Sequence, residues 1–375
     1  MLYLDHAATT PIRPEVVEAM APYLGDRFGN PSGIHATARR AKNSIEEARE
    51  RIAASIGAAN PLEIVFTGGG TEADNLAVIG AAMAGPGGVV TTAVEHPAVL
   101  ESARFLSRIG YEVTILPVDG EGRVAPDAVA NAVGDGTAVV SVMTANNETG
   151  VIQSVAEVAR LVRSSNDRTL IHTDAVQAFG SLPVDVSRDG TDLVSVSGHK
   201  IGGPQGVGFL HVRSGIQLEP VIYGGGQELG RRSGTHNVAA IVGLAVAVES
   251  TVAGRSNYRE RVGAARDRFE HDLRSNVNVE VTTDDADRLV SHAHLRFPGI
   301  PAETLLVRLD FAGVAAAAGA ACHSGAIQES HVLAAMGVGN TAASESVRFS
   351  FGRDDDAETG AKAARIVTGV VEDLS

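Results

Sequence analysis

The sequence predicts an α/β protein with a mostly parallel sheet and a smaller α+β part towards the C-terminus. Between residues 62 and 212, β-branched runs typical of strands alternate with segments of helical spacing. Strands interleaved with helices favour a parallel sheet that is covered on both faces. The chain has 375 residues, more than one core usually serves, and it becomes polar and charged near residues 253–256. We therefore expect a large domain over 15–254 and a small domain formed by 1–14 and 255–375.

The expected strands of the large domain are short runs rich in Val, Ile, Leu and Thr. They cover residues 62–67, 88–94, 111–116, 137–143, 169–173, 192–197 and 207–212. One helix is expected from about Glu72, and another where apolar residues recur at helical spacing (Ala41, Ile45, Ala48, Ile52 and Ile56). The small domain is expected to hold strands at 279–282, 293–297 and 314–318 and a final helix over 361–374.

Composition excludes several classes of protein. The net charge of −14 argues against a protein that binds nucleic acid directly, because phosphates demand basic patches. A single cysteine cannot form an intrachain disulfide, so nothing indicates an oxidising compartment. The N-terminus lacks a basic region followed by an apolar stretch, and the longest apolar runs are shorter than a membrane span needs. We expect a cytoplasmic protein with no membrane partner.

Candidate ligand-binding residues stand where the expected strands end, the place where α/β sheets bind their ligands. The segment 68–71 (Gly-Gly-Gly-Thr) joins a strand to a helix start, which offers free N–H groups to an anion; a tight turn is the alternative. Asp174 either pairs with a protonated ring nitrogen or caps a helix. His96 either stacks on a ring and moves protons or is structural.

Lysine is rare in this chain, which narrows the search for a nucleophilic amine. Only Lys42, Lys200 and Lys362 are present, and arginine cannot replace lysine in a Schiff base. Lys42 lies on a charged helical face, and Lys362 lies at the edge of the last expected helix. Lys200 follows a buried strand, where desolvation lowers the pKa of the amine and makes it a nucleophile. Lys200 is therefore the candidate Schiff-base lysine.

Short motifs occur in a fixed order along the chain. They are Phe66–Asn75, Glu95-His96, Asn146–Gly150, Asp174–Gln177, Ser197–Lys200, Arg232–Thr235 and Val347–Ser350. Together with segments 3–10 and 29–32, this set resembles the cysteine desulfurases of the class V pyridoxal-phosphate aminotransferase family, over essentially the whole chain. The resemblance implies the type I fold of pyridoxal-phosphate transferases, with a large domain around a mostly parallel sheet and a smaller α+β C-terminal domain. It also implies pyridoxal 5'-phosphate as the cofactor.

The resemblance implies a role for each matching residue. Cys322, Lys200 and His96 would be catalytic. Lys200 would hold the cofactor covalently, and the other cofactor-binding residues would be Gly70, Thr71, His96, Asn147, Asp174, Gln177, Ser197, His199 and, from the other subunit of a homodimer, Thr235. Asn147 and Arg348 would orient the substrate carboxylate, although a surface ion pair is the alternative for Arg348. No metal ion is expected.

Cys322, the only cysteine, lies in a run of small residues where the family places its catalytic thiol. The resemblance implies conversion of L-cysteine to L-alanine with a persulfide on Cys322, for transfer to an acceptor protein in iron–sulfur cluster assembly or thiolation. His323 stands where threonine is common in the family, and it either favours the thiolate or is incidental. The chain ends at Ser375, close to the last expected helix, which leaves docking to an iron–sulfur scaffold open.

Three other functions compete with this hypothesis. A selenocysteine lyase, or a related pyridoxal-phosphate lyase, would use the same residues. A non-haem iron oxygenase would use His172 and Asp174 with a distant histidine, but that interpretation leaves Lys200 and the glycine motifs unexplained. A sulfur-transfer scaffold would bind the cofactor without releasing alanine.

Overall fold

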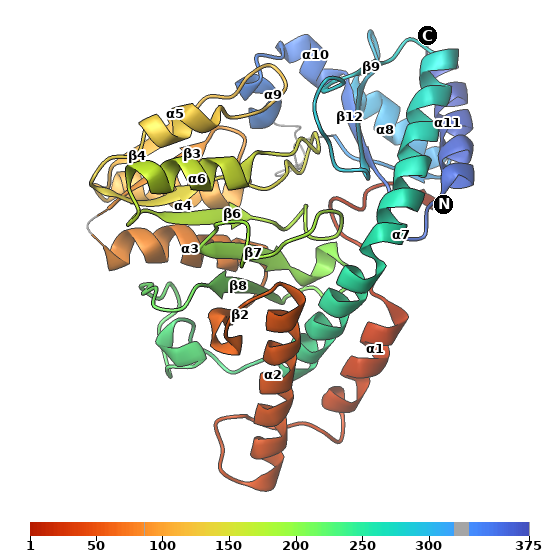
Figure 1. Cartoon of the computed structure of the whole chain (residues 1–375). Coiled ribbons are helices and arrows are strands. Elements are labelled where there is room, and N and C mark those ends of the chain that lie inside the picture. The colour runs from red at the N-terminus through yellow and green to blue at the C-terminus, as the bar shows by residue number, and fades with distance from the viewer. Residues whose placement is uncertain (86, 319–329, 375) are drawn as a thin grey trace.

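The computed structural model describes residues 1–85, 87–318 and 330–374 (Figure 1). Its centre is a seven-stranded sheet in the order β2-β8-β7-β6-β5-β3-β4. The strands are β2 (Ile64–Thr67), β3 (Gly88–Thr92), β4 (Val113–Leu116), β5 (Thr137–Ser141), β6 (Leu170–Asp174), β7 (Leu193–Ser197) and β8 (Gly208–Val212). Only β8 runs antiparallel to its neighbours β2 and β7. The expected mostly parallel sheet is confirmed.

The first expected strand begins two residues later than the sequence suggested. Pro61–Glu63 forms a 3-10 turn, η2, before β2. Asn60 caps this turn through its side chain, and the Glu63 carboxylate reaches back to the backbone N–H of Asn60. This reciprocal capping favours the turn over an extended backbone.

Helices cover both faces of the sheet. They are α2 (Ala36–Ser55), α3 (Gly70–Ala84), α4 (Pro97–Arg108), α5 (Pro126–Asn131) and α6 (Val155–Ser165). Successive residues of a strand point to opposite faces, and Val139 packs with α3 and α4 whereas Val140 packs with α5 and α6. The central strands are therefore buried on both sides, as parallel strands in α/β proteins are.

A second, smaller sheet lies beside the first. It has the order β12-β10-β9, with β9 (Glu280–Val281), β10 (His292–Arg296) and β12 (Ser346–Ser350) antiparallel. Its core also takes residues from α8 (Ala302–Phe311) and α11 (Ala357–Glu372). The N-terminal strand β1 (Leu2–Tyr3) pairs with β11 (Val314–Ala315), and Leu4 is buried in the same core. The N-terminal and C-terminal parts of the chain thus share one core. The expected domain boundaries, 15–254 against 1–14 and 255–375, stay a prediction.

One helix, α7 (Val238–Asn276), continues across residue 254, where the sequence suggested a boundary. Leu244 and Val248 lie in the core of the large sheet, whereas Phe269 and Leu273 lie in the core of the small sheet. In Figure 1 the helix passes from α2 to α11. Among the described residues it alone is long and apolar enough to cross a membrane, but 61% of its apolar window is buried inside the protein, as in a core helix.

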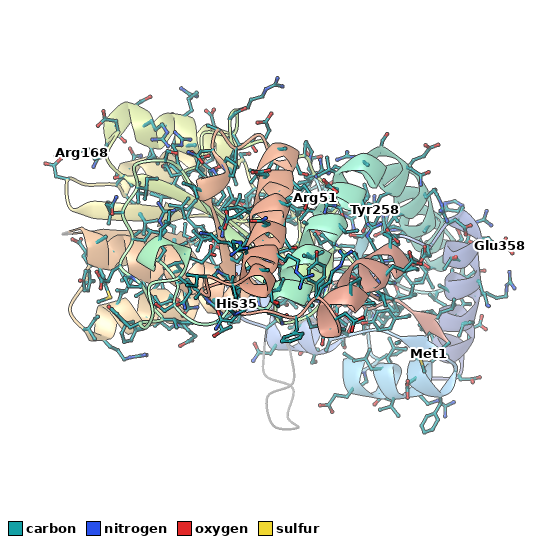
Figure 2. All side chains as sticks on the ribbon, turned by 90° about the horizontal axis from the view of Figure 1, so that it is seen from below. Met1, His35, Arg51, Arg168, Tyr258 and Glu358 are labelled. Carbon is teal, nitrogen blue, oxygen red and sulfur yellow. The ribbon has the colours of Figure 1, made fainter. Side chains whose placement is uncertain are left out.

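The remaining short helices complete the surroundings of the sheet. They are α1 (Pro14–Met20), α9 (His331–Ala335) and α10 (Asn340–Ser344). Val332 and Leu333 of α9 pack on Val94, directly after β3, so α9 lies at the end of the large sheet. Figure 2 shows Met1 and Glu358 at one end of the molecule and Arg168 at the other, with α2 marked by His35 and Arg51 between them.

Candidate active site

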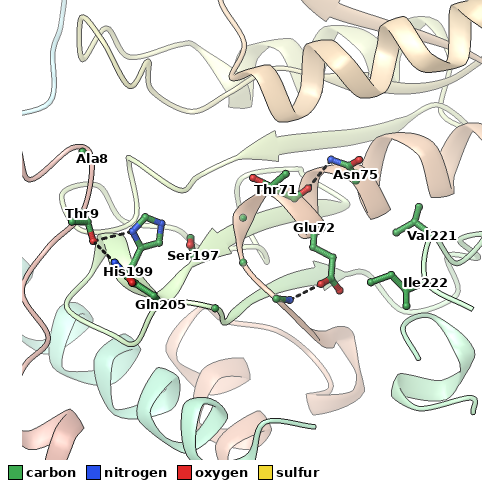
Figure 3. A pocket seen from close by; sticks show the side chains of 14 residues that line it. Ala8, Thr9, Thr71, Glu72, Asn75, Ser197, His199, Gln205, Val221 and Ile222 are labelled. Carbon is green, nitrogen blue, oxygen red and sulfur yellow. Dashed lines mark hydrogen bonds between the residues drawn. The ribbon is translucent and has the colours of Figure 1, made fainter. Parts of the chain in front are cut away.

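Two adjoining cavities open at the carboxyl edge of the large sheet. The larger, of about 850 Å³, is lined by side chains from both sheets and from the N-terminal segment, among them Asp5, His96, Asp174, Lys200 and Arg348. The other, of about 780 Å³, is shown in Figure 3. Both are lined by Ala8, Gly70, Thr71, Ser197 and His199. The cavities therefore form one continuous site.

Lys200 ends a short 3-10 turn, η3 (Gly198–Lys200), directly after the buried strand β7. Its Nζ donates to the carbonyl oxygens of Ala7 and, at 2.8 Å, Ala8. Burial and the nearby Arg348 lower the pKa of the amine to about 8, against the opposing effect of Asp174. Lys42 and Lys362 are exposed. Lys200 is therefore the lysine with an enclosed, readily deprotonated amine.

Asp174 and His96 face the same cavity from two neighbouring parts of the sheet edge. Asp174 ends β6, and its Oδ1 accepts from the backbone N–H of Val176 at 2.8 Å. Burial raises the pKa of this carboxyl, although His96 and Lys200 oppose the shift. His96 caps α4 through Nδ1, which accepts from the N–H of Ala98 at 3.1 Å. Both expected alternatives for His96, the structural and the site role, are thus compatible with its position.

The start of α3 forms the floor of the smaller cavity. Its N-cap is Gly69, whose φ of 148° suits glycine and whose position provides no capping side chain. A Cβ on Gly70 would lie 2.8 Å from a methyl group of Val176, so only glycine brings the backbone this close to the site. The first N–H groups of the helix consequently have no side-chain acceptor, and they suit a phosphate group.

Polar side chains surround this helix start (Figure 3). They are Thr9, Thr71, Glu72, Asn75, Ser197, His199 and Gln205, and the carboxylate of Glu72 is paired with Arg232. Nδ1 of His199 lies 3.2 Å from Oγ1 of Thr9, which fixes the ring against the N-terminal segment. Burial and the nearby Lys200 lower the pKa of His199 to about 4, so the ring is a neutral hydrogen-bonding group at neutral pH. The site thus has a place for an anion next to a lysine.

Arg348 lies in the central part of β12 and is buried, in contrast to the surface ion pair considered as an alternative. Its Nη2 donates to Oδ1 of Asp5 at 2.7 Å, and its Nη1 donates to the carbonyl oxygen of Asn147 at 2.8 Å. Its Nε is buried without a partner among the described residues. The guanidinium lines the cavity that also holds Lys200, so it suits a carboxylate there.

Gln177 lines the same cavity as Lys200. Its Nε2 donates to the carbonyl oxygen of Ala7 at 2.8 Å, the same oxygen that accepts from Lys200. The structure thus brings together, at one site, Gly70, Thr71, His96, Asn147, Asp174, Gln177, Ser197, His199, Lys200 and Arg348.

One expected site residue is not brought to this site, and another lies outside the described residues. Thr235 is exposed and does not line either cavity of its own chain. Cys322, together with His323, lies outside the described residues.

The iron-oxygenase hypothesis disagrees with the surroundings of His172. Its Nδ1 lies 2.8 Å from Oγ of Ser141, and its Nε2 lies 3.0 Å from Oγ of Ser195. With both ring nitrogens in hydrogen bonds, His172 has no nitrogen left for a metal. No group of three or more metal-ligating side chains occurs within 1–85, 87–318 and 330–374.

Several residues of the site escaped the sequence reasoning. Asp5 holds Arg348, and His331 lines the cavity from α9. Glu95, directly before His96, is buried, and burial raises its pKa to about 8. Asp5 and Glu95 belong to the motifs named above, and a charged residue among apolar neighbours could have identified both as site residues. His331 offered no such signal, because a histidine at a helix start is common.

Comparisons with known proteins agree with this geometry. Residues 2–359 match the family model of aminotransferase class-V. The chain is 43% identical to cysteine desulfurase IscS of Dictyoglomus turgidum, over 94% of this chain and 89% of that protein. A solved NifS-like protein superposes with a TM-score of 0.92 at 34% identity, covering 100% and 99% of the two chains. The solved structure of SspA in complex with cysteine has a TM-score of 0.83 at 34% identity, covering 95% and 100%.

Proposed function

The chain belongs to the class-V aminotransferase family, and we propose that it is a cysteine desulfurase that converts L-cysteine to L-alanine and forms a persulfide on Cys322. One observation carries the proposal: Lys200 and Arg348 line the same cavity, so an amine and a carboxylate anchor face one substrate. The family depends on pyridoxal 5'-phosphate. The names of the relatives, and the cysteine held by the similar SspA, support L-cysteine as the substrate.

The described residues fit this cofactor. Its phosphate would lie at the start of α3, where the N–H groups lack a capping side chain, with Thr71, Ser197 and His199 as further donors. Asp174 would bind the protonated ring nitrogen, since a buried carboxylate with a raised pKa gains most from a cationic partner. The remaining contacts would come from Gly70, His96, Asn147, Gln177 and, covalently, Lys200.

When bound, pyridoxal phosphate supplies an electron sink for the charge that develops at the Cα atom of the amino acid. Arg348 holds the substrate carboxylate with its planar fork, and Asn147 positions Arg348 through its carbonyl oxygen. Nζ of Lys200, once free, takes the proton from Cα. Its lowered pKa of about 8 keeps a useful fraction of the amine neutral near physiological pH.

The enzyme would act as a homodimer in which Thr235 completes the phosphate site of the other subunit. This assignment is supported by the exposure of Thr235 and by exposed apolar side chains near both the α1–α2 connection and the segment before Thr235, among them Phe28, Ile34, Tyr223 and Leu229. A cytoplasmic location suits the chemistry, because a reducing compartment keeps the thiol of Cys322 free. The sulfur would then pass to an acceptor protein in cluster assembly or thiolation.

The test uses the purified full-length protein loaded with pyridoxal phosphate. We expect L-cysteine to yield L-alanine, measured by chromatography, and a mass increase of one sulfur atom on the peptide that contains Cys322. Lys200→Ala should abolish steady-state turnover, whereas Lys42→Ala, on an exposed helical face, should leave it unchanged. Sustained alanine formation by Lys200→Ala would refute the assignment, and wild-type protein that binds the cofactor but releases no alanine would favour the scaffold hypothesis.

A further inference from the structure

His331, the first residue of α9, lines the larger cavity although the expected chemistry gives it no role. Its Nε2 lies 2.9 Å from the backbone carbonyl oxygen of Glu95. A carbonyl oxygen can only accept, so Nε2 carries the hydrogen in this contact. In the neutral ring, Nδ1 is then left with a lone pair and can act as a base.

His96, the neighbouring histidine of the same cavity, has the opposite arrangement. Its Nδ1 accepts from the backbone N–H of Ala98, so in the neutral ring Nε2 carries the hydrogen. His96 can donate a hydrogen bond but has no free lone pair. The third histidine lining this cavity, His199, is hydrogen-bonded to Thr9 near the start of α3. Among the described histidines of this cavity, His331 is therefore placed to take a proton beside the substrate.

The position of His331 is fixed by its surroundings. Val332 and Leu333 are buried against Val94. Ser330 caps α9 by accepting from the N–H of Leu333 at 3.1 Å, and its hydroxyl donates to Oε2 of Glu148 at 2.6 Å. The other charged or titratable side chains that line this cavity come from the N-terminal segment, from the ends of the large sheet's strands, from α3 and α4 and from β12. They are Asp5, Asp74, His96, Glu101, Arg104, Glu148, Asp174, His199, Lys200 and Arg348.

We propose that His331 is a further catalytic residue, which carries the proton of the substrate thiol to the carbon atom that loses the sulfur. This inference rests on the proposed desulfurase function. That reaction breaks the C–S bond and joins the sulfur to the thiolate of the enzyme, and the carbon keeps the electron pair of the broken bond. The substrate S–H proton must then leave the sulfur as the persulfide anion forms, and the carbon must gain one proton to become the methyl group of alanine.

His331 links these two requirements. Nδ1 takes the proton from the sulfur and returns it to Cβ, so L-cysteine and the enzyme thiolate give L-alanine and the enzyme persulfide anion. Atoms and charge balance, and no external oxidant or reductant is needed. Because general acid–base catalysis typically contributes about 10²–10⁴-fold, the loss of this base should be large but not complete.

The experiment compares two variants of the cofactor-loaded enzyme. His331→Gln keeps an amide donor for the carbonyl oxygen of Glu95 but has no base, and we expect its kcat for alanine formation to fall by roughly 10²–10⁴-fold with little change in KM. His331→Ala leaves a space, and added imidazole should restore its rate in proportion to the neutral imidazole present. Imidazole should not rescue His331→Gln, whose side chain fills the space. The absorbance of the bound cofactor should match that of the wild type in both variants.

A wild-type kcat in His331→Gln would overturn the proposal. Two slow variants that imidazole does not accelerate would also overturn it, because a purely structural role predicts that result. These results can be told apart from a failure of the proposed desulfurase function. In that case the wild-type enzyme itself would release no alanine from L-cysteine, and the role of His331 would be refuted with it.

Discussion

The guanidinium of Arg348 is bound to the carboxylate of Asp5, with 2.7 Å between Nη2 and Oδ1, although the two residues are separated by 343 positions in the sequence. The carbonyl oxygens of Ala7 and Ala8, a few residues after Asp5, accept from Nζ of Lys200. The N-terminal segment therefore contacts both the residue expected to anchor the substrate carboxylate and the lysine expected to hold the cofactor. Any change in this segment should affect both.

We expect Arg348→Ala to raise KM for L-cysteine by roughly ten- to a hundredfold. A hydrogen bond to a charged group is worth about 1.5–3 kcal/mol, and each 1.4 kcal/mol is a factor of ten in affinity. Arg348→Lys should give a smaller increase, because lysine keeps the charge but lacks the planar fork. Initial rates of alanine formation over a range of L-cysteine concentrations give KM for each variant. An unchanged KM in Arg348→Ala would show that another residue holds the carboxylate.

The lowered pKa of Lys200 predicts how the protein without cofactor takes up pyridoxal phosphate. Only the neutral amine attacks the aldehyde, so the rate of uptake should rise with pH and level off above about 8, the pKa that burial gives this amine. Stopped-flow absorbance after mixing protein and cofactor across this range measures the rate. Lys42→Ala is the control. A rate that keeps rising towards 10.5, the ordinary pKa of a lysine side chain, would contradict the assignment.

Most of the fold could be predicted from the sequence, because buried parallel strands are apolar runs that stop at polar residues. Asp174, His96 and Lys200 could be placed at one sheet edge for the same reason. The continuity of α7 could not be foreseen, since its composition changes where it passes from one core to the other, and a polar stretch within a helix resembles a linker.

Contacts between residues far apart in the chain could not be predicted from the sequence either. Nothing local indicates that Asp5 pairs with Arg348, or that the carbonyl oxygen of Glu95 fixes the tautomer of His331. Such pairs are set by how β1, β12 and α9 pack, not by spacing along the chain. The motifs could therefore identify the residues that hold the cofactor, but not those that position or assist them.

Cys322→Ala distinguishes desulfurase from selenocysteine lyase. We expect the variant to bind the cofactor with unchanged absorbance but to form no persulfide and no alanine from L-cysteine, because the sulfur has lost its acceptor. Parallel assays with L-cysteine and L-selenocysteine measure both activities. Turnover of selenocysteine that survives the substitution, with loss of cysteine turnover, would favour the lyase, since selenium leaves carbon more readily than sulfur does.

Glu228 should stabilise the fold through the segment that leads to Thr235. Its two carboxylate oxygens accept from Arg49, at 2.8 Å each, and one also accepts from the backbone N–H of Phe66 at 3.0 Å. Although burial alone would raise its pKa, the hydrogen bonds from Arg49 and His236 lower it to about 2. We expect Glu228→Gln to destabilise the protein by about 3–5 kcal/mol, because it leaves the Arg49 charge without its buried carboxylate partner and with only the exposed Glu46.

The pH dependence of this difference follows from the direction of the shift. A carboxylate whose folded pKa is lowered contributes its full stability above its unfolded pKa, which is ordinarily 4.5 for glutamate, and loses it as the pH falls towards 2. The gap between wild type and Glu228→Gln in urea denaturation should therefore be full at pH 7 and shrink below about pH 4.5. Glu46→Gln is the matched control: Glu46 also contacts Arg49, at 3.1 Å, but its side chain is 42% exposed, so its loss should cost at most about 1 kcal/mol. Equal effects of the two substitutions would show that Arg49 does not need Glu228 to remain buried.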